Sequence, residues 1–177
     1  RLCAKYLGRS VNGVTDADLS AIEQMLIRQK SHIRSFHSDD GQDLLVSGEA
    51  DLVMEYNGDM GFVMRELADR DLDFVIPEEG SLMTADCLCI PHGAPNVAGA
   101  HASINYLLDG ETGRGIAETI QYPTPNRAAR DLMPASYRDS AVIFPPADII
   151  DKCEYAVFEG DARIRRYEDI FERVMAA

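Results

Sequence analysis

Residues 83–91 read Met-Thr-Ala-Asp-Cys-Leu-Cys-Ile-Pro, a nearly apolar run that carries one acid, Asp86. Gly80 and Pro91 bound this run, and a short apolar run between turn residues predicts a buried strand. A carboxylate inside a buried strand is costly unless a cationic group meets it. We therefore expect the rest of the chain to hold Asp86 for a cationic ligand.

The composition is that of an acidic chain with enough apolar residues for a core. The 177 residues suffice for one domain or two small lobes, 46% of them are hydrophobic, and the formal net charge is -13. Such a charge argues against nucleic acid, whose phosphates require a basic face. It suits a small cationic ligand, although solubility alone can also explain it.

The four cysteines are Cys3, Cys87, Cys89 and Cys153, and they form no C-x-x-C pair. Cys87 and Cys89 fall on one face of the expected strand, so with His92 they could bind a metal. The alternative is that they are buried structural thiols. This thiol-metal site is also the only enzyme hypothesis that names residues, because the common nucleophile, zinc-protease and phosphate-loop motifs are absent from the sequence.

Strand and helix signals alternate in the first half of the chain, and helix signals dominate the second half. We expect an α/β fold in which the second half covers a sheet. The predicted strands are residues 33–36, 50–56, 72–76 and 83–91. The predicted helices are one ending near Gly8 and then residues 15–31, 42–47 (capped by residues 38–40 and closed by Gly48), 60–68, 97–108, 111–120, 126–132, one beginning at 145–148, and 162–175.

A site for a cation needs carboxylates for charge and aromatic faces for cation–π contact. Besides Asp86, the sequence offers Tyr56 at a strand end, Asp59 in the following turn, and Tyr122 in a Tyr-Pro-Thr-Pro loop. Strand ends are where α/β folds place ligands. Each residue also has a structural reading: the tyrosines as packing or loop anchors, Asp59 as a helix-start acid, and Asp86 as an acid satisfied by backbone donors.

Four runs of this sequence closely resemble the spermidine/putrescine-binding proteins of bacterial ABC importers. They are residues 48–58 (GEADLVMEYNG), 86–91 (DCLCIP), 104–108 (INYLL) and 117–129 (AETIQYPTPNRAA). The resemblance extends in order over nearly the whole chain. It implies a periplasmic binding protein of the type II-like fold, whose two lobes close on a polyamine. Such a protein delivers its ligand to the membrane permease, needs no cofactor and is not an enzyme.

The resemblance also assigns roles to residues. It places Asp86 as the acid that pairs with a ligand ammonium, Tyr56 as the aromatic residue that packs on the polyamine, and Asp59 as a second amine-binding acid of the putrescine type. Tyr122 matches the family's site tyrosine. Thr84 stands where the family usually has a large aromatic residue, which could widen the pocket.

Two further departures leave the identity of the polyamine open. Ala156 stands near the position of a polar contact that it cannot make, and tryptophan, usual in the family's site, is absent from the sequence. The related alternative is therefore a binding protein for another small solute.

The resemblance further implies that this chain corresponds to the C-terminal half of such a protein, with an acidic segment expected before Arg1. Residues 1–84 and 123–177 are expected to form the C-terminal lobe, nearly complete. Residues 85–122 are expected to cross the hinge into the N-terminal lobe. If the chain exists alone, residues 86–121 should expose apolar surface and could lead it to self-associate.

Overall fold

The structure is a computed structural model that describes residues 1–37 and 40–177. The chain forms two compact units, each built from segments far apart in the sequence. Unit 1 comprises Arg1–His37, Ile76–Thr84 and Ala147–Ala177, and unit 2 comprises Ser38–Val75 and Ala85–Pro146. The expected cap at residues 38–40 lies partly outside the described residues. The assignment of residues 85–122 to a separate lobe stays a prediction.

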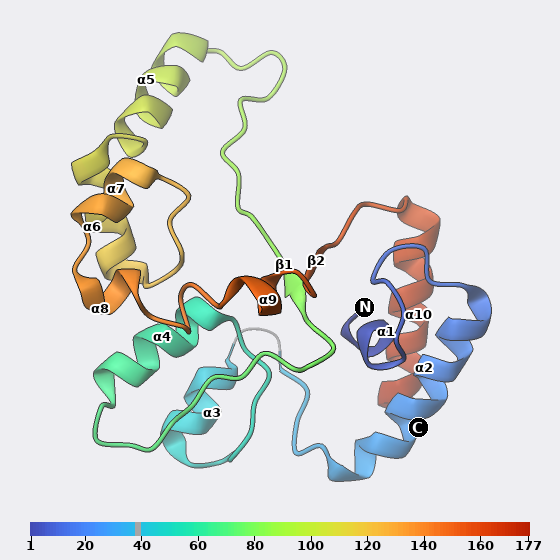
Figure 1. The fold of residues 1–177 in the computed structure, drawn as a ribbon. Helices are drawn as coiled ribbons and strands as arrows, with labels where there is room; N and C mark the ends of the chain where they lie inside the picture. The colour runs from blue at the N-terminus through green and yellow to red at the C-terminus, as the bar shows by residue number, and fades with distance from the viewer. Residues whose placement is uncertain (38–39) are drawn as a thin grey trace. The chain divides into compact units, whose positions relative to one another are not determined.

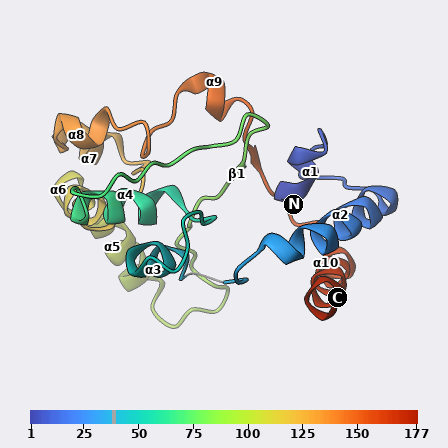
Figure 2. The ribbon, with the colours of Figure 1, turned by 90° about the horizontal axis from the view of Figure 1, so that it is seen from below.

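Unit 1 is organised on two helices, α2 (Asp16–Gln29) and α10 (Asp161–Ala176), which lie side by side (Figure 1, Figure 2). Their facing side chains form one buried apolar cluster with the short helix α1 (Leu2–Tyr6). Each fully buried aliphatic side chain contributes about 1.5–3 kcal/mol. The members of the cluster are Ala4, Val14, Leu19, Ile22, Ile170 and Val174.

The start of α2 is fixed by a capping box. The Thr15 hydroxyl accepts from the Asp18 N–H, and the Asp18 carboxylate accepts from the Thr15 N–H at 3.0 Å. Two N–H groups that the helix leaves without partners are thereby satisfied. The helix predicted over residues 15–31 is confirmed as α2 followed by the 3-10 turn η1 (Lys30–His32).

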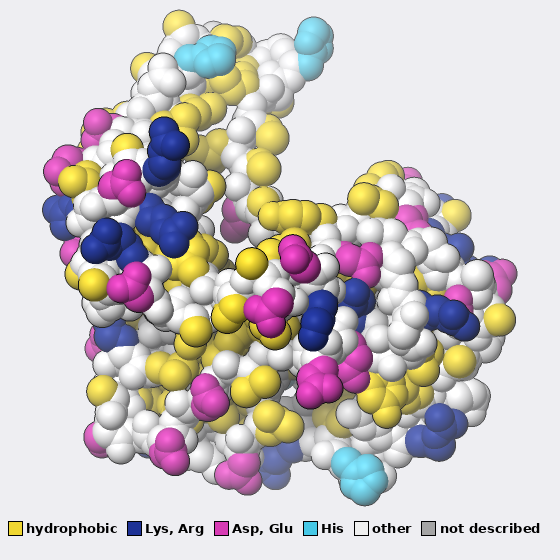
Figure 3. Space-filling model, viewed as in Figure 1, with side chains coloured by type: hydrophobic (Ala, Val, Ile, Leu, Met, Phe, Trp, Pro, Cys, Tyr) yellow, Lys and Arg dark blue, Asp and Glu magenta, His cyan; other side chains and the backbone are white. Residues whose placement is uncertain are grey.

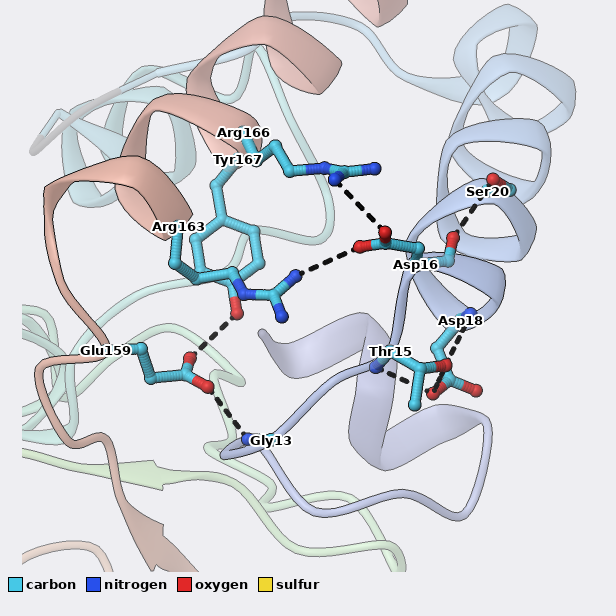
Figure 4. Close-up of polar contacts among 9 residues, drawn as sticks. All are labelled: Gly13, Thr15, Asp16, Asp18, Ser20, Glu159, Arg163, Arg166 and Tyr167. Atoms are coloured by element: carbon cyan, nitrogen blue, oxygen red, sulfur yellow. Dashed lines mark hydrogen bonds and ion pairs between the residues drawn. The ribbon is translucent and has the colours of Figure 1, made fainter.

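Charged side chains tie α10 and the loop before it to the first residues of the chain (Figure 4). Asp16 pairs with Arg163 and Arg166 at 3.4 and 3.1 Å. Glu159 accepts from the Gly13 N–H and from the Tyr167 hydroxyl, both at 2.9 Å. Exposed ion pairs contribute little, about 0–1 kcal/mol each. The apolar cluster therefore holds the two helices together, and the polar contacts fix their register.

A short parallel pair of strands completes unit 1, with α9 (Ala147–Ile150) preceding its second strand. β1 (Leu82–Met83) pairs with β2 (Glu154–Tyr155). Gly80 leads into β1 at φ +88°, and a Cβ there would overlap the Lys152 carbonyl. This close approach of two backbones explains the glycine.

Unit 2 contains the remaining α-helices. They are α3 (Gly41–Ser47), α4 (Asn57–Glu66), α5 (Val97–Leu107), α6 (Gly110–Ile120), α7 (Arg127–Leu132) and α8 (Ala135–Arg138). Its buried cluster is made by Ala117, Met133, Tyr137 and Ile143, with Phe144 packed edge-on against the Tyr137 ring. The helices predicted in this part of the sequence are confirmed within a few residues, and Gly48 ends α3 at φ 75°.

The strand predictions over residues 33–36, 50–56 and 72–76 were wrong, and of the predicted strand 83–91 only Met83 lies in a strand. Among the described residues, the strands are the two-residue β1 and β2. Residues 72–76 still alternate, with Leu72, Phe74 and Ile76 half-buried between exposed neighbours. The local pattern is thus present, but a strand needs a hydrogen-bonded neighbour, and the β1–β2 ladder ends at Met83.

The interpretation of Asp86 as buried is corrected for the same reason. Residues 84–89 lie beyond the ladder and are exposed. The apolar exposure expected of residues 86–121 is present: Leu88 and Tyr106 are 65% and 67% exposed. Figure 3 shows hydrophobic side chains on the surface of α5 and of the extended segment before it. No helix in the described part of the chain is long and apolar enough to cross a membrane.

Candidate functional site

The candidate site lies at the amino end of α4, in unit 2. Tyr56 is the N-cap residue of this helix, and Asp59 lies in its first turn. Negative charge is stabilised there by the helix dipole. The Asn57 side chain donates to the Val142 carbonyl oxygen at 2.9 Å and so anchors this end of the helix.

Tyr122 reaches the same point from the end of α6. Gln121 ends that helix in the left-handed conformation, at φ 58°, and turns the chain into the Tyr-Pro-Thr-Pro loop. The buried Tyr137 anchors this loop through two hydrogen bonds of its hydroxyl group. Its hydroxyl donates to the Tyr122 carbonyl oxygen at 2.6 Å and accepts from the Thr124 N–H at 2.9 Å.

The Tyr122 hydroxyl donates to Asp59 Oδ2 at 2.7 Å, which joins the two predicted site residues directly. The ring of Tyr122 lies against Gly58. A Cβ added at Gly58 would overlap the ring atoms Cγ, Cδ2 and Cε2. Gly58 therefore provides the space in which the ring sits, and the ring position brings the hydroxyl to Asp59.

The surroundings keep the Tyr122 phenol protonated. Burial raises its pKa, and the hydrogen bond to Asp59 and the negative charges of Asp59 and Glu55 raise it further. Because its proton is committed to Asp59, the phenol oxygen can offer only lone pairs to any other group. Such an oxygen selects hydrogen-bond donors.

Of the other predicted residues, Tyr56 lies next to this pair and is 51% exposed, so its ring is free to contact a ligand. Asp86 and Thr84 are exposed on the extended segment. Within the described residues, no hydrogen bond joins either of them to Asp59 or Tyr122. The structure thus brings together Tyr56, Asp59 and Tyr122, and it leaves the roles of Asp86 and Thr84 as predictions.

The thiol-metal alternative gains no support from the arrangement of its residues. Cys87, Cys89 and His92 are all exposed. In the described part of the chain, no three His, Cys, Asp or Glu side chains gather as a metal site would require. The alternative reading of Cys87 and Cys89 as buried thiols is wrong, because both side chains are exposed.

Sequence reasoning missed two neighbours of the site, Gly58 and Glu55. Gly58 was part of a turn signal, Asn-Gly-Asp, but its role is to admit an aromatic ring. Glu55 stands as the polar member of the run Val-Met-Glu-Tyr. The available signal was an acid directly before Tyr56, a predicted site residue.

The comparisons with known proteins now identify the family. Residues 11–153 match the family model described as bacterial extracellular solute-binding protein. The chain belongs to this family. It is 34% identical, over 99% of its length, to the spermidine/putrescine-binding periplasmic protein of Salmonella typhimurium, and 33% identical over the same share to that of Escherichia coli. It is 28% identical over 81% of its length to the putrescine-binding periplasmic protein PotF of Escherichia coli.

Solved structures agree with this chain in fold. A protein described as a spermidine/putrescine ABC transporter from Listeria monocytogenes matches with a TM-score of 0.84 and 26% identity, over 98% of this chain and 53% of that one. The predicted fold class, α/β and of the periplasmic-binding-protein kind, is confirmed. The chain spans about half the length of the relatives it matches: 50% of each of the two spermidine/putrescine-binding proteins and 40% of PotF.

Proposed function

We propose that this chain is part of the solute-binding component of a bacterial ABC importer, located in the periplasm, that binds a polyamine such as putrescine or spermidine. The observation that carries the proposal is the Tyr122–Asp59 hydrogen bond at the amino end of α4, beside the exposed ring of Tyr56. The named relatives are described as binding proteins for these polyamines. The family resemblance of the sequence predicts amine-binding residues at these positions.

The chemistry of this corner fits an alkyl ammonium ion. Its N–H groups donate to the lone pairs of the Tyr122 oxygen and to the Asp59 carboxylate, and charge-assisted bonds of this kind are the strong ones. The Tyr56 ring can cover the ammonium and the methylene chain that follows it. The chain's net charge of -13 attracts cationic solutes over a longer range.

Asp86 would pair with a second ammonium, and Thr84 would leave more room in the pocket than the family's usual aromatic residue. In this proposal the distance between the acids selects the ligand by the number of methylene groups between its amines. Closure of the protein around the ligand removes water and strengthens both ammonium–carboxylate pairs. No step of this function requires a catalytic group, so we propose that the protein is not an enzyme.

The partners would be the polyamine and the permease subunits that receive it. We also propose that the chain by itself associates through the apolar side chains exposed on residues 86–121. These exposed side chains include Leu88, Tyr106, Leu108, Ile116 and Ile120. Exposed apolar side chains favour contact with a second apolar surface.

Calorimetric titration of putrescine and spermidine into the whole natural protein that carries this chain tests the proposal. Tight binding that is lost in both Asp59→Asn and Asp86→Asn is expected. Asp151→Asn, an exposed acid in unit 1, serves as a charge-matched control that should bind normally. If the folded protein binds neither polyamine, the ligand is another solute, and zinc would then be tested with Cys87→Ser as its control.

A further inference from the structure

We propose that Glu55 is a second carboxylate of the same corner, and that with Asp59 and Tyr122 it selects a primary ammonium group over a quaternary one. This inference rests on the proposed function and adds a residue that the resemblance does not assign. It concerns the substrate class of the site, because quaternary ammonium ligands are recognised by aromatic faces without N–H donors.

The two oxygens of Glu55 have different surroundings. Oε1 accepts from the Tyr56 N–H at 3.0 Å, so the side chain folds back to the amino end of α4. Oε2 is buried and accepts no hydrogen bond from any described residue. A buried acceptor without a donor is costly, and native proteins keep few of them, often where a ligand supplies the partner.

Glu55 directly precedes Tyr56, the N-cap residue of the helix whose first turn carries Asp59. Its charge, together with that of Asp59, adds to the effect of burial in raising the pKa of that hydroxyl. The proton of the phenol cannot compensate Glu55, because it is donated to Asp59 Oδ2. Two carboxylates and one acceptor oxygen thus share this corner.

The described residues supply no cation to neutralise these carboxylates. Among the described residues, no ion pair involves Glu55 or Asp59. The arginine of the same helix, Arg65, lies in its last turn, where it pairs with Glu66 and donates to the Glu118 carbonyl oxygen. A ligand cation is therefore the group that this arrangement lacks.

A primary ammonium group matches the three acceptors in number. It carries three N–H donors, and in this proposal they donate to Glu55 Oε2, an oxygen of Asp59 and the Tyr122 oxygen. A quaternary ammonium has no N–H, so it would leave Glu55 Oε2 unpartnered. Sites built to hydrogen-bond a donor reject analogues that lack it.

Titration of putrescine and of its bis-quaternary analogue into the whole protein, wild type and Glu55→Gln, tests the inference. Putrescine is expected to bind about 10- to 100-fold more weakly to Glu55→Gln, since one charge-assisted hydrogen bond is lost. The analogue should bind weakly and equally to both proteins. Glu66→Gln removes the same charge at the other end of α4 and should leave the affinity within about twofold.

The thermal midpoint of the ligand-free protein separates a ligand role from a structural one. Removing one of two neighbouring carboxylates should leave the midpoint unchanged or raise it, while affinity falls. A lower midpoint together with weaker binding would make Glu55 structural, and unchanged binding would equally overturn the inference while leaving the polyamine proposal intact. If the wild type binds no amine and Asp59→Asn changes nothing, the proposed function fails and the inference with it.

Discussion

Replacing Gly58 by alanine tests how the site is built, because local and tertiary effects of this change have opposite signs. Gly58 lies in the first turn of α4, where alanine is the better helix former by about 0.5–1 kcal/mol. The added Cβ, however, would overlap three ring atoms of Tyr122. Carbon atoms in contact lie about 3.5–4.0 Å apart, so the ring would have to withdraw by about an ångström or more.

The expected cost follows from what that movement disrupts. Overpacking costs about 1–3 kcal/mol, and the Tyr122–Asp59 hydrogen bond, which involves a charged acceptor, is worth about 1.5–3 kcal/mol. After the helix gain is subtracted, we expect Gly58→Ala to destabilise the protein by about 3 kcal/mol. For a chain of this length, that lowers the thermal midpoint by about 6–12 °C.

Two glycines serve as matched controls in the same assay, thermal unfolding followed by circular dichroism. A Cβ at Gly61, also in α4, would make only ordinary contacts, and one at Gly115 in α6 would meet open space. Both alanine variants should raise the midpoint by about 2 °C through helix propensity alone.

The phenol supplies a second readout for Gly58→Ala. Once the ring leaves Asp59, the pKa of Tyr122 should fall back towards that of a free tyrosine, which phenolate absorbance records. If Gly58→Ala instead stabilises the protein as the controls do, and the phenol still titrates late, the ring is not seated on Gly58 and the reasoning about the site is refuted.

Three further changes have defined outcomes. Tyr137→Phe leaves the Tyr122 carbonyl and the Thr124 N–H without their buried partner and should cost about 2 kcal/mol in urea unfolding; a cost near zero would show that the loop does not depend on it. Thr15→Ala removes the capping box of α2 and should cost about 1 kcal/mol, and it should raise the lowered pKa of Asp18, which NMR titration measures. The third change is Tyr122→Phe. Because the folded-state pKa of Tyr122 is raised, its contribution to stability is complete below the pKa of a free tyrosine and is lost as pH rises through the folded value. Above about pH 10, the free energy of urea unfolding should therefore depend more steeply on pH for the wild type than for Tyr122→Phe.

Most of the helices were predictable from sequence because their signals are local, whereas the four-residue α8 was not predicted. Thr15 and Asp18 cap α2 across three residues, Asn126 accepts from the Ala129 N–H at the start of α7, and Gly48 ends α3 in the left-handed conformation. Each signal operates within one turn of the helix that it delimits. The structure therefore places these boundaries within a few residues of the predicted ones.

The strands were not predictable in the same way, because a strand forms only when another segment of the chain pairs with it. Leu72, Phe74 and Ile76 keep the alternating burial that the sequence indicated, yet they pair with nothing in the described residues. In the part of the chain that the structure describes, the ladder joins Leu82 and Met83 to Glu154 and Tyr155, some seventy residues away. Apolar alternation shows that a segment can form a ladder, whereas the presence of the ladder depends on where the partner lies.

The residues of the site could likewise be identified from the sequence, but their arrangement in space could not. Tyr56, Asp59 and Tyr122 could be chosen by residue type, but their meeting depends on Gln121 turning the end of α6 and on the missing side chain of Gly58. Neither residue is charged or aromatic, so a search for charged and aromatic groups passes over both. Glu55 was passed over although it directly precedes Tyr56, because its chemistry is ordinary and its buried oxygen without a donor is visible in the structure alone. Its functional reading therefore depends on three-dimensional surroundings that no spacing in the sequence encodes.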